Sequence, residues 1–215
     1  MPLSTDNPIL GPRFADALAY AHELHRAQIR KGSEIPYVSH LLAVAGIVLE
    51  HGGDEDEAIA GLLHDAAEDQ GGQPVLDTIA LRFGDRVAQI VEGCSDSLAV
   101  DDTQKAPWKE RKVKYLAHFA GCDASTRRVS MADKLHNCRT TIADLHEHGA
   151  RTFERFNAAR AEQLWFYRAF VDSARALDDG PLARLLERNV AELERLAHLP
   201  TPHAATTAGA PGVTS

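Results

Sequence analysis

The residues best suited to chemistry lie in the segment Leu62-Leu63-His64-Asp65-Ala66-Ala67-Glu68-Asp69. It places an imidazole beside a carboxylate, and two further carboxylates follow about one helical turn later. If the segment is one helix, Glu68 lies at i+4 from His64 and Asp69 at i+4 from Asp65. Four ionisable groups then share one edge of an otherwise apolar helix. A metal bound by His64 and Asp65, with Glu68 and Asp69 facing the reaction space, explains this pattern.

An ordinary structural explanation fits the segment alone equally well, because His-Asp pairs are common and Glu68-Asp69 resembles a solvated helix end. Two residues elsewhere favour the metal. His40 precedes an apolar run, and Asp133 lies in the largely apolar stretch Val129-Ser130-Met131-Ala132-Asp133. A polar residue on an apolar helix face is more often a hydrogen-bonded core residue than a ligand. Together, however, they complete a set of two imidazoles and two carboxylates: His40, His64, Asp65 and Asp133.

This ligand set predicts a catalytic metal centre. Mixed imidazole and carboxylate donors suit Mn²⁺ and also permit Fe²⁺, Co²⁺, Mg²⁺ or Zn²⁺. A six-coordinate ion with these protein ligands keeps open positions for water and a substrate oxygen, which a structural site lacks. Glu68 and Asp69 can then orient or deprotonate the polarised water.

Composition and charge limit the class of protein. The 215 residues are 44% hydrophobic and 25% charged, as expected for one helix-rich globular core with a tail. A formal net charge of −8 argues against nucleic-acid binding, although local positive charge can still bind an anionic small molecule. Three cysteines without C-x-x-C spacing, no visible signal peptide and no membrane-length apolar run favour a cytoplasmic protein without a membrane partner.

Helical periodicity and capping residues predict an all-α fold. We expect no strand and no internal repeat, a mobile loop at 95–107 and a disordered tail at 199–215. One domain should cover 1–198, with a motif core at about 15–145 and C-terminal helices at about 150–198. The helices are expected at about 7–28, 39–51, 54–71, 74–83, 84–94, 107–121, 123–144, 150–176 and 181–196.

The ordered motifs resemble the HD superfamily of metal-dependent phosphohydrolases. More narrowly, they are similar to the hydrolase domain of the Rel/SpoT alarmone enzymes and to the stand-alone small alarmone hydrolases. The resemblance spans about residues 15–145, with a looser match in the last helices. The matching stretches are Ala21-His22, His25, Gln28, Arg30-Lys31, Pro36-Tyr37, His40, Leu62-Leu63-His64-Asp65, Glu68-Asp69, Phe83-Gly84, Val87, Val91, Ala132-Asp133-Lys134-Leu135-His136-Asn137 and Arg139-Thr140.

The resemblance implies a single-domain helical HD bundle that hydrolyses (p)ppGpp at its 3′-pyrophosphate, giving GDP or GTP and pyrophosphate. It implies Mn²⁺ on the four metal ligands and water activation by Glu68 and Asp69. Arg30 and Lys31 would face the base and phosphates, and Asn137 would approach the ribose. A guanidinium can stack on a purine, and an ammonium can pair with phosphate. A solvated basic helix end is the alternative explanation for Arg30 and Lys31.

One motif departs from the family pattern, and the substrate and the catalytic activity stay open. Where alarmone hydrolases commonly read Gly-x-Thr-Lys, this chain reads Gly93-Cys94-Ser95-Asp96, so base or phosphate recognition should differ. The chain has no room for a synthetase domain, so only degradation is implied. Two alternatives stay open: an HD phosphohydrolase for another nucleotide such as (p)ppApp or NADPH, and a metal-bound nucleotide sensor without turnover. The sequence leaves the oligomeric state open.

Overall fold

The computed structural model describes residues 10–99 and 106–198, and these residues are arranged as helices. The expected all-α class is confirmed; the described part contains one isolated β-bridge, between Ile29 and Pro36. The expected tail and the centre of the expected loop lie outside the described residues. The helices are α1 (Pro12–His25), α2 (Val38–Glu50), α3 (Glu55–Leu63), α4 (Ala66–Gln70), α5 (Gln73–Phe83), α6 (Asp85–Cys94), α7 (Trp108–Gly121), α8 (Ala124–His148), the 3₁₀ helix η2 (Gly149–Arg155), α9 (Arg160–Leu177) and α10 (Pro181–Ala197).

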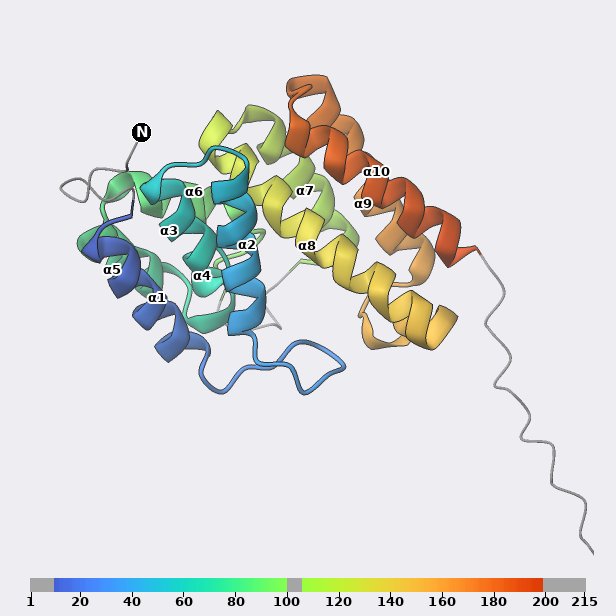
Figure 1. Ribbon diagram of the computed structural model, residues 1–215, viewed down its shortest axis with the longest axis horizontal. Coiled ribbons are helices and arrows are strands. Elements are labelled where there is room, and N and C mark those ends of the chain that lie inside the picture. Colours follow the sequence, from blue (N-terminus) through green and yellow to red (C-terminus); the bar gives the residue numbers. More distant parts are fainter. Residues whose placement is uncertain (1–9, 100–105, 199–215) are drawn as a thin grey trace, which may run out of the picture.

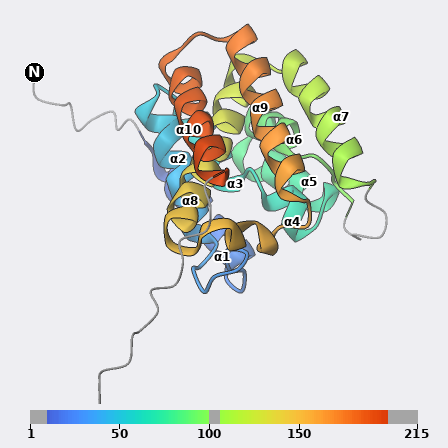
Figure 2. The same cartoon turned by 90° about the vertical axis from the view of Figure 1, so that its right-hand side faces the viewer.

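Helix α8 connects two groups of helices. Figure 1 shows it running diagonally from the group α1–α6 to the pair α9 and α10. It packs against α2, α3 and α6 on one side and against α9 and α10 on the other. Helix α7 lies beside α9 (Figure 2). Fully buried Leu41, Leu62, Leu63, Leu135 and Leu186 contribute to one continuous apolar core.

A capping box starts α3, as expected. The Asp54 carboxylate accepts from the main-chain N–H of Glu57, and the Glu57 carboxylate accepts from that of Asp54. The helix does not continue to Gly71, however. It ends at Leu63, and α4 begins at Ala66. The prediction that His64, Asp65, Glu68 and Asp69 share one edge of a single helix is therefore wrong.

A close approach of α2 and α3 positions the histidines. A Cβ atom at Gly61 would lie 3.1 Å from the Ala45 Cα and 3.3 Å from the Ala45 nitrogen. A side chain at position 61 would force the two helices apart by a few tenths of an ångström, because both contacts are with main-chain atoms rather than with a flexible side chain. The two helices consequently bring His40 and His64 to one point, with ring centroids 5.1 Å apart.

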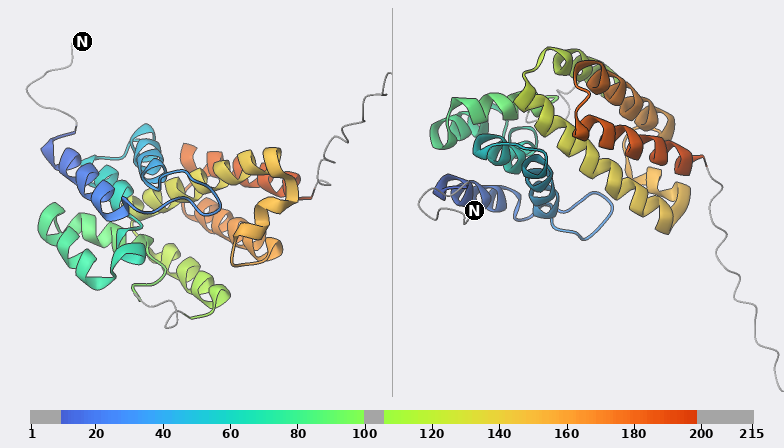
Figure 3. Two further views of the ribbon diagram at one scale, coloured as in Figure 1. Left: turned by 90° about the horizontal axis from the view of Figure 1, so that it is seen from below. Right: turned by 45° about the horizontal axis from the view of Figure 1, so that its top comes forward.

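Other boundaries also differ from expectation. Helix α1 ends at His25, which leaves Gln28 in the following connection; the expected start at Asn7-Pro8 lies outside the described residues. The expected helix at 150–176 is wrong in its first part, since η2 and a loop precede α9. Seen from below in Figure 3, the connection between α1 and α2 lies near α8. No helix in the described part of the chain is long and apolar enough to cross a bilayer.

Candidate active site

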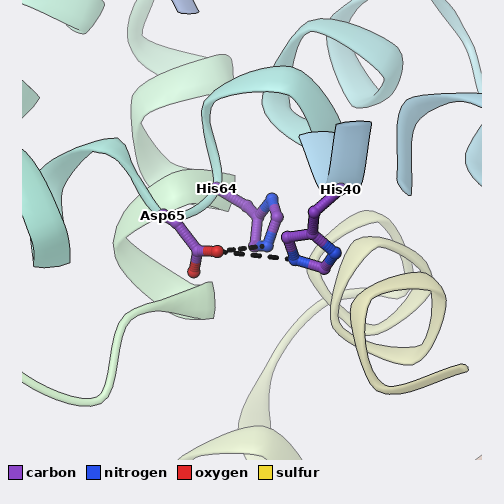
Figure 4. A group of neighbouring side chains, drawn as sticks. All are labelled: His40, His64 and Asp65. Atoms are coloured by element: carbon purple, nitrogen blue, oxygen red, sulfur yellow. Dashed lines mark ion pairs between the residues drawn. The ribbon is translucent and has the colours of Figure 1, made fainter. Parts of the chain in front are cut away.

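Four predicted metal ligands from α2, α8 and the break between α3 and α4 converge in the core. His40 Nε2 lies 3.5 Å from Asp65 Oδ2 and 3.2 Å from Asp133 Oδ1. His64 Nε2 lies 3.0 Å from Asp65 Oδ2 and 3.6 Å from Asp133 Oδ1. Figure 4 shows His40, His64 and Asp65 pointing toward one another. One donor atom from each of these three lies within 4.8 Å of the others.

The Nε2 atoms of His40 and His64, which face Asp65 and Asp133, are suitably placed to bind a cation. His64 Nδ1 lies 2.9 Å from the Gly61 carbonyl and His40 Nδ1 lies 2.7 Å from His136 Nδ1. With Nδ1 donating in each case, Nε2 is the ring nitrogen that a cation can use. Both Nε2 atoms are buried, and each lies within 3.6 Å of Asp65 and Asp133 oxygens. Without a cation a proton on His64 offsets that carboxylate charge, and a divalent metal can replace the proton, so the donor set suits such an ion.

The carboxylates control the charge of this cluster. Burial alone would lower the pKa of His64, but Asp65 and Asp133 outweigh it and raise that pKa well above its ordinary value. Burial would likewise raise the pKa of Asp133, whereas the adjacent Lys134 ammonium and the two histidines hold it well below the usual range. The carboxylates are therefore ionised at neutral pH. They supply the negative charge that a divalent cation requires.

Neighbouring side chains orient the four ligands. The Tyr37 hydroxyl donates to Asp65 Oδ2 at 2.6 Å. The Asn137 amide donates to Asp133 Oδ1, and Lys134 pairs with Asp133 Oδ2. Roles for Tyr37, His136 and Lys134 were not predicted from the sequence. The only signal in the sequence was position: Tyr37 precedes His40 by three residues, and Lys134 and His136 follow Asp133 by one and three.

Glu68 and Asp69, the predicted water-activating pair, have different surroundings. Glu68 Oε2 accepts from the main-chain N–H of Asp96 at 3.1 Å. Burial, together with the charges of Asp96 and Asp65, raises the pKa of Glu68 to about 8. Asp69 is exposed and accepts from Gln28 Nε2 at 2.8 Å. Both lie in α4, directly after the turn that carries Asp65, and different neighbours hold their side chains.

Gln28 was also missed as part of this site. Its Oε1 lies 2.7 Å from His25 Nδ1 and accepts from Gln70 Nε2 at 2.5 Å. Its Nε2 is thereby directed at Asp69. The sequence could not identify this role, because the contact joins positions that are 41 residues apart.

The predicted substrate-binding residues line one cavity of about 580 Å³ beside the ligand cluster. Arg30 donates to Asn137 Oδ1 at 2.8 Å and lies 5.7 Å from the Tyr37 ring centroid. Lys31 donates to Asn157 at 2.6 Å on the exposed rim. Lys112, Lys134 and His136 also line the cavity. In an acidic protein this local concentration of positive charge suits an anionic ligand.

The chain is similar to characterised phosphohydrolases. A family model described as "HD domain" matches residues 17–162. The chain is 39% identical over 127 residues to the guanosine-3′,5′-bis(diphosphate) 3′-pyrophosphohydrolase MESH1 of Xenopus tropicalis, covering 58% of this chain and 66% of that protein. The mouse protein of the same name is 35% identical over 130 residues, with coverages of 59% and 68%.

A longer relative and a solved structure extend this comparison. A probable guanosine-3′,5′-bis(diphosphate) 3′-pyrophosphohydrolase of Synechocystis is 34% identical over 127 residues, but this chain spans only 16% of its length. The solved structure, described as a metazoan ortholog of SpoT that hydrolyses ppGpp, superposes with a TM-score of 0.66 at 25% identity. That superposition covers 88% of this chain and 97% of the other. The chain belongs to the HD-domain family, and within it is similar to the Rel/SpoT-like proteins.

Proposed function

We propose that the protein hydrolyses (p)ppGpp at the 3′-pyrophosphate. The water oxygen bonds to the phosphorus attached to ribose O3′, and O3′ leaves with a proton as the 3′-hydroxyl of GDP or GTP. Pyrophosphate is the second product. The observation that carries the proposal is the convergence of the buried His40 and His64 Nε2 atoms on the carboxylates of Asp65 and Asp133. They adjoin a cationic cavity in a chain related to enzymes named for this reaction.

The proposed metal ligands are His40, His64, Asp65 and Asp133, with Mn²⁺ as the preferred ion for mixed imidazole and carboxylate donors. When bound, the ion supplies Lewis acidity that acidifies water and withdraws charge from a phosphoryl oxygen. Tyr37 and Asn137 hold the two carboxylates in position, and His136 holds the His40 ring. These contacts preorganise the cluster before substrate arrives.

Glu68 and Asp69 are proposed to act on the attacking water. An ionised carboxylate within reach of the water accepts its proton as the oxygen–phosphorus bond forms, and a pKa of about 8 means that Glu68 acts as this base only in its ionised fraction at neutral pH. Hydrogen bonds from the Asp96 main chain to Glu68, and from Gln28 to Asp69, fix the two carboxylates independently. A binding protein without turnover has no need of this pair, which counts against the nucleotide-sensor alternative.

Arg30, Lys31 and Asn137 are proposed to bind the nucleotide. The Arg30 guanidinium is held by Asn137, and its planar face can stack on a purine. Lys31 lies on the rim, where an ammonium can meet phosphate charge. The three free thiols of Cys94, Cys122 and Cys138 favour a reducing compartment, and we propose the cytoplasm as the location.

A nucleotide panel tests the proposal. The purified protein is incubated with Mn²⁺ and separately with ppGpp, pppGpp, ppApp or NADPH, and the products are separated by ion-exchange chromatography. We expect GDP and pyrophosphate from ppGpp, with the highest kcat/KM for a guanosine alarmone. Faster turnover of ppApp or NADPH would contradict the substrate assignment. Binding of ppGpp without any product would identify a sensor.

A further inference from the structure

Asp96 is a buried carboxylate next to the candidate active site. Its side chain is only 2% exposed, although it lies in the connection that follows α6. Lys112 Nζ lies 2.6 Å from Asp96 Oδ2, and Arg111 pairs with Asp96 Oδ1. Burying an ionised carboxylate is unfavourable unless such partners compensate for the lost hydration. Arg111 and Lys112 therefore stabilise the buried Asp96 carboxylate, and the three side chains form one ion-pair cluster.

The same residue contacts the proposed water-activating machinery through its main chain. The Asp96 N–H donates to Glu68 Oε2 at 3.1 Å. Its carboxylate and its amide consequently point to two different groups, Lys112 and Glu68. The backbone after α6 thus fixes the separation of the Lys112 ammonium from the Glu68 carboxylate.

Lys112 faces the substrate cavity. It lines the same space as Arg30 and Asn137, with its ammonium 5.1 Å from the Phe166 ring centroid. The Lys134 ammonium lies 6.0 Å from the same centroid and pairs with Asp133. The two ammonium groups therefore share one aromatic wall. Asp96 takes one of the three N–H donors of Lys112; the other two make no hydrogen bond to the residues that the structure describes and face the cavity that a ligand would occupy.

Arg111 makes the cluster cationic. Asp96 alone would neutralise Lys112, but Arg111 adds a second positive charge and donates from Nε to the Ala106 carbonyl at 3.2 Å. This second contact fixes the start of α7 relative to Asp96. Arg111, Lys112 and Asp96 together carry one net positive charge, and of these three side chains the Lys112 ammonium lines the cavity, where a phosphate group is attracted.

We propose that Lys112 binds a phosphate group of the substrate and that Asp96 is the positioning residue that holds it there. This inference rests on the proposed hydrolysis of a phosphorylated nucleotide, and it adds a recognition group from α7 to those on the α1–α2 connection and α8. Asp96 acts only through Lys112 and Glu68 and has no contact of its own with the substrate.

Steady-state kinetics on four variants test the proposal. Lys112→Ala removes the ammonium, Asp96→Asn removes the carboxylate while keeping the main-chain N–H, and Lys112→Arg keeps a cation. Lys114→Ala is the matched control, because Lys114 lies on the same helix with a side chain that is 71% exposed. We expect Lys112→Ala and Asp96→Asn each to raise KM for ppGpp about tenfold or more, as for loss of a charged hydrogen bond.

The split between kinetic constants identifies the role. The value of kcat should change less than about threefold, because Glu68 keeps its main-chain donor. Lys112→Arg and Lys114→Ala should stay close to wild type. Adding Asp96→Asn to Lys112→Ala should raise KM no further, since the carboxylate then has no ammonium to position. Additive effects, or an unchanged KM in Lys112→Ala, would overturn the proposal.

A binding measurement separates this inference from the proposed function. Calorimetric titration of ppGpp and of inorganic pyrophosphate into the Mn²⁺-loaded proteins requires no turnover. If wild type binds the probes without hydrolysing ppGpp, the proposed function fails, and weaker binding by Lys112→Ala but not Lys114→Ala still supports the inference. Hydrolysis by wild type with equal affinities in all variants would overturn the inference alone. Absence of binding by wild type would overturn both.

Discussion

Individual histidine nitrogens determine the chemistry that this centre can support. His64 Nδ1 is committed to the Gly61 carbonyl, and His40 Nδ1 to His136. Burial and the nearby His40 lower the pKa of His136 to about 4, so its ring is neutral at physiological pH and can accept from His40. These Nδ1 contacts therefore leave Nε2 of each ring directed at Asp65 and Asp133, where an ion that displaces the His64 proton can bind. Hydrogen bonds of this kind fix the ring orientation and raise the affinity of imidazole for metals.

The proposed roles of Glu68 and Asp69 predict a separation of metal binding from turnover. Glu68→Gln and Asp69→Asn remove a proton acceptor but leave the four ligands intact. We expect metal content near wild type and a fall in kcat of about 10²–10⁴-fold, the usual contribution of a general base. Elemental analysis and steady-state kinetics on the same preparations provide the measurement. Loss of metal with full turnover per remaining ion would show that the roles are reversed.

Arg30 provides a residue-scale test of substrate recognition. Arg30→Ala should mainly raise KM, because it removes an interaction that substrate and transition state share. The rise should be about tenfold if the guanidinium contacts the nucleotide. Arg26→Ala is the control, since Arg26 is an exposed residue at the end of α1 that pairs with Glu23. Equal KM values for both variants and wild type, measured with ppGpp, ppApp and NADPH, would leave Arg30 as a surface residue.

Among the elements, the break at His64-Asp65 marks the limit of sequence-based prediction. The capping box at Asp54 and the glycines after α4 predicted the outer ends of the helical segment. The interior gave no such signal, since Leu62 to Asp69 contains neither glycine nor proline. The Asp65 carboxylate is directed at Tyr37 and the histidines instead of capping α4, so tertiary contacts produce the turn. The proximity of His40, His64, Asp65 and Asp133 could still be predicted, because that expectation depended on residue types and their order and not on an unbroken helix.

The close contact of α2 and α3 at Gly61 supports the geometry of the proposed metal centre. Gly61→Ala would force a methyl group against the Ala45 backbone, which should cost about 1–3 kcal/mol and separate His40 from His64. Gly46→Ala is the matched control in α2, where an added Cβ has nothing within 4 Å. Alanine there should stabilise the helix by about 0.5–1 kcal/mol. Urea unfolding and metal content measure both effects; equal stability of the two variants would contradict the packing argument.

Helix α8 carries a pH-dependent cap. The main-chain N–H of Thr126 donates to Asp123 and lowers the pKa of that carboxyl below its ordinary value. A lowered folded-state pKa stabilises the protein above the unfolded-state value near 3.8, and the effect is lost as pH falls through the folded-state pKa. Asp123→Ala should therefore destabilise by about 1 kcal/mol at neutral pH and by less in acid.

Asp123→Asn distinguishes the cap from its charge. Asparagine keeps an acceptor oxygen for the Thr126 N–H, so most of the stability should be retained without the acid dependence. Thermal unfolding of the three proteins between about pH 3 and pH 7 measures this difference. An alanine variant with the same deficit at every pH would show that the charge contributes nothing.

At the scale of the whole molecule, contacts between distant segments account for what the sequence could not predict. The resemblance indicated altered recognition at Asp96, but it gave no reason to join this residue to α7. The contacts with Arg111 and Lys112 span 15 and 16 positions and depend on how α7 packs beside α9. Helical periodicity predicts which face of α7 is apolar; it does not predict which neighbour its cations meet. The positive charge that α7 adds to the cavity, beside that of the α1–α2 connection and α8, was therefore not predicted.

Because the proposed ligands come from α2, α8 and the α3–α4 break, metal binding should stabilise the entire bundle. An ion that binds only the folded protein contributes about 2.7 kcal/mol at a free concentration one hundred times Kd. For a chain of this size that corresponds to a rise in Tm of about 5–10 °C. Calorimetry of the chelator-treated protein with and without Mn²⁺ measures the shift. Asp133→Asn should abolish it, whereas Glu68→Gln should retain it because Glu68 is assigned to water. A full shift in Asp133→Asn would remove α8 from the metal site, and no shift in wild type would mean that the four residues do not bind Mn²⁺.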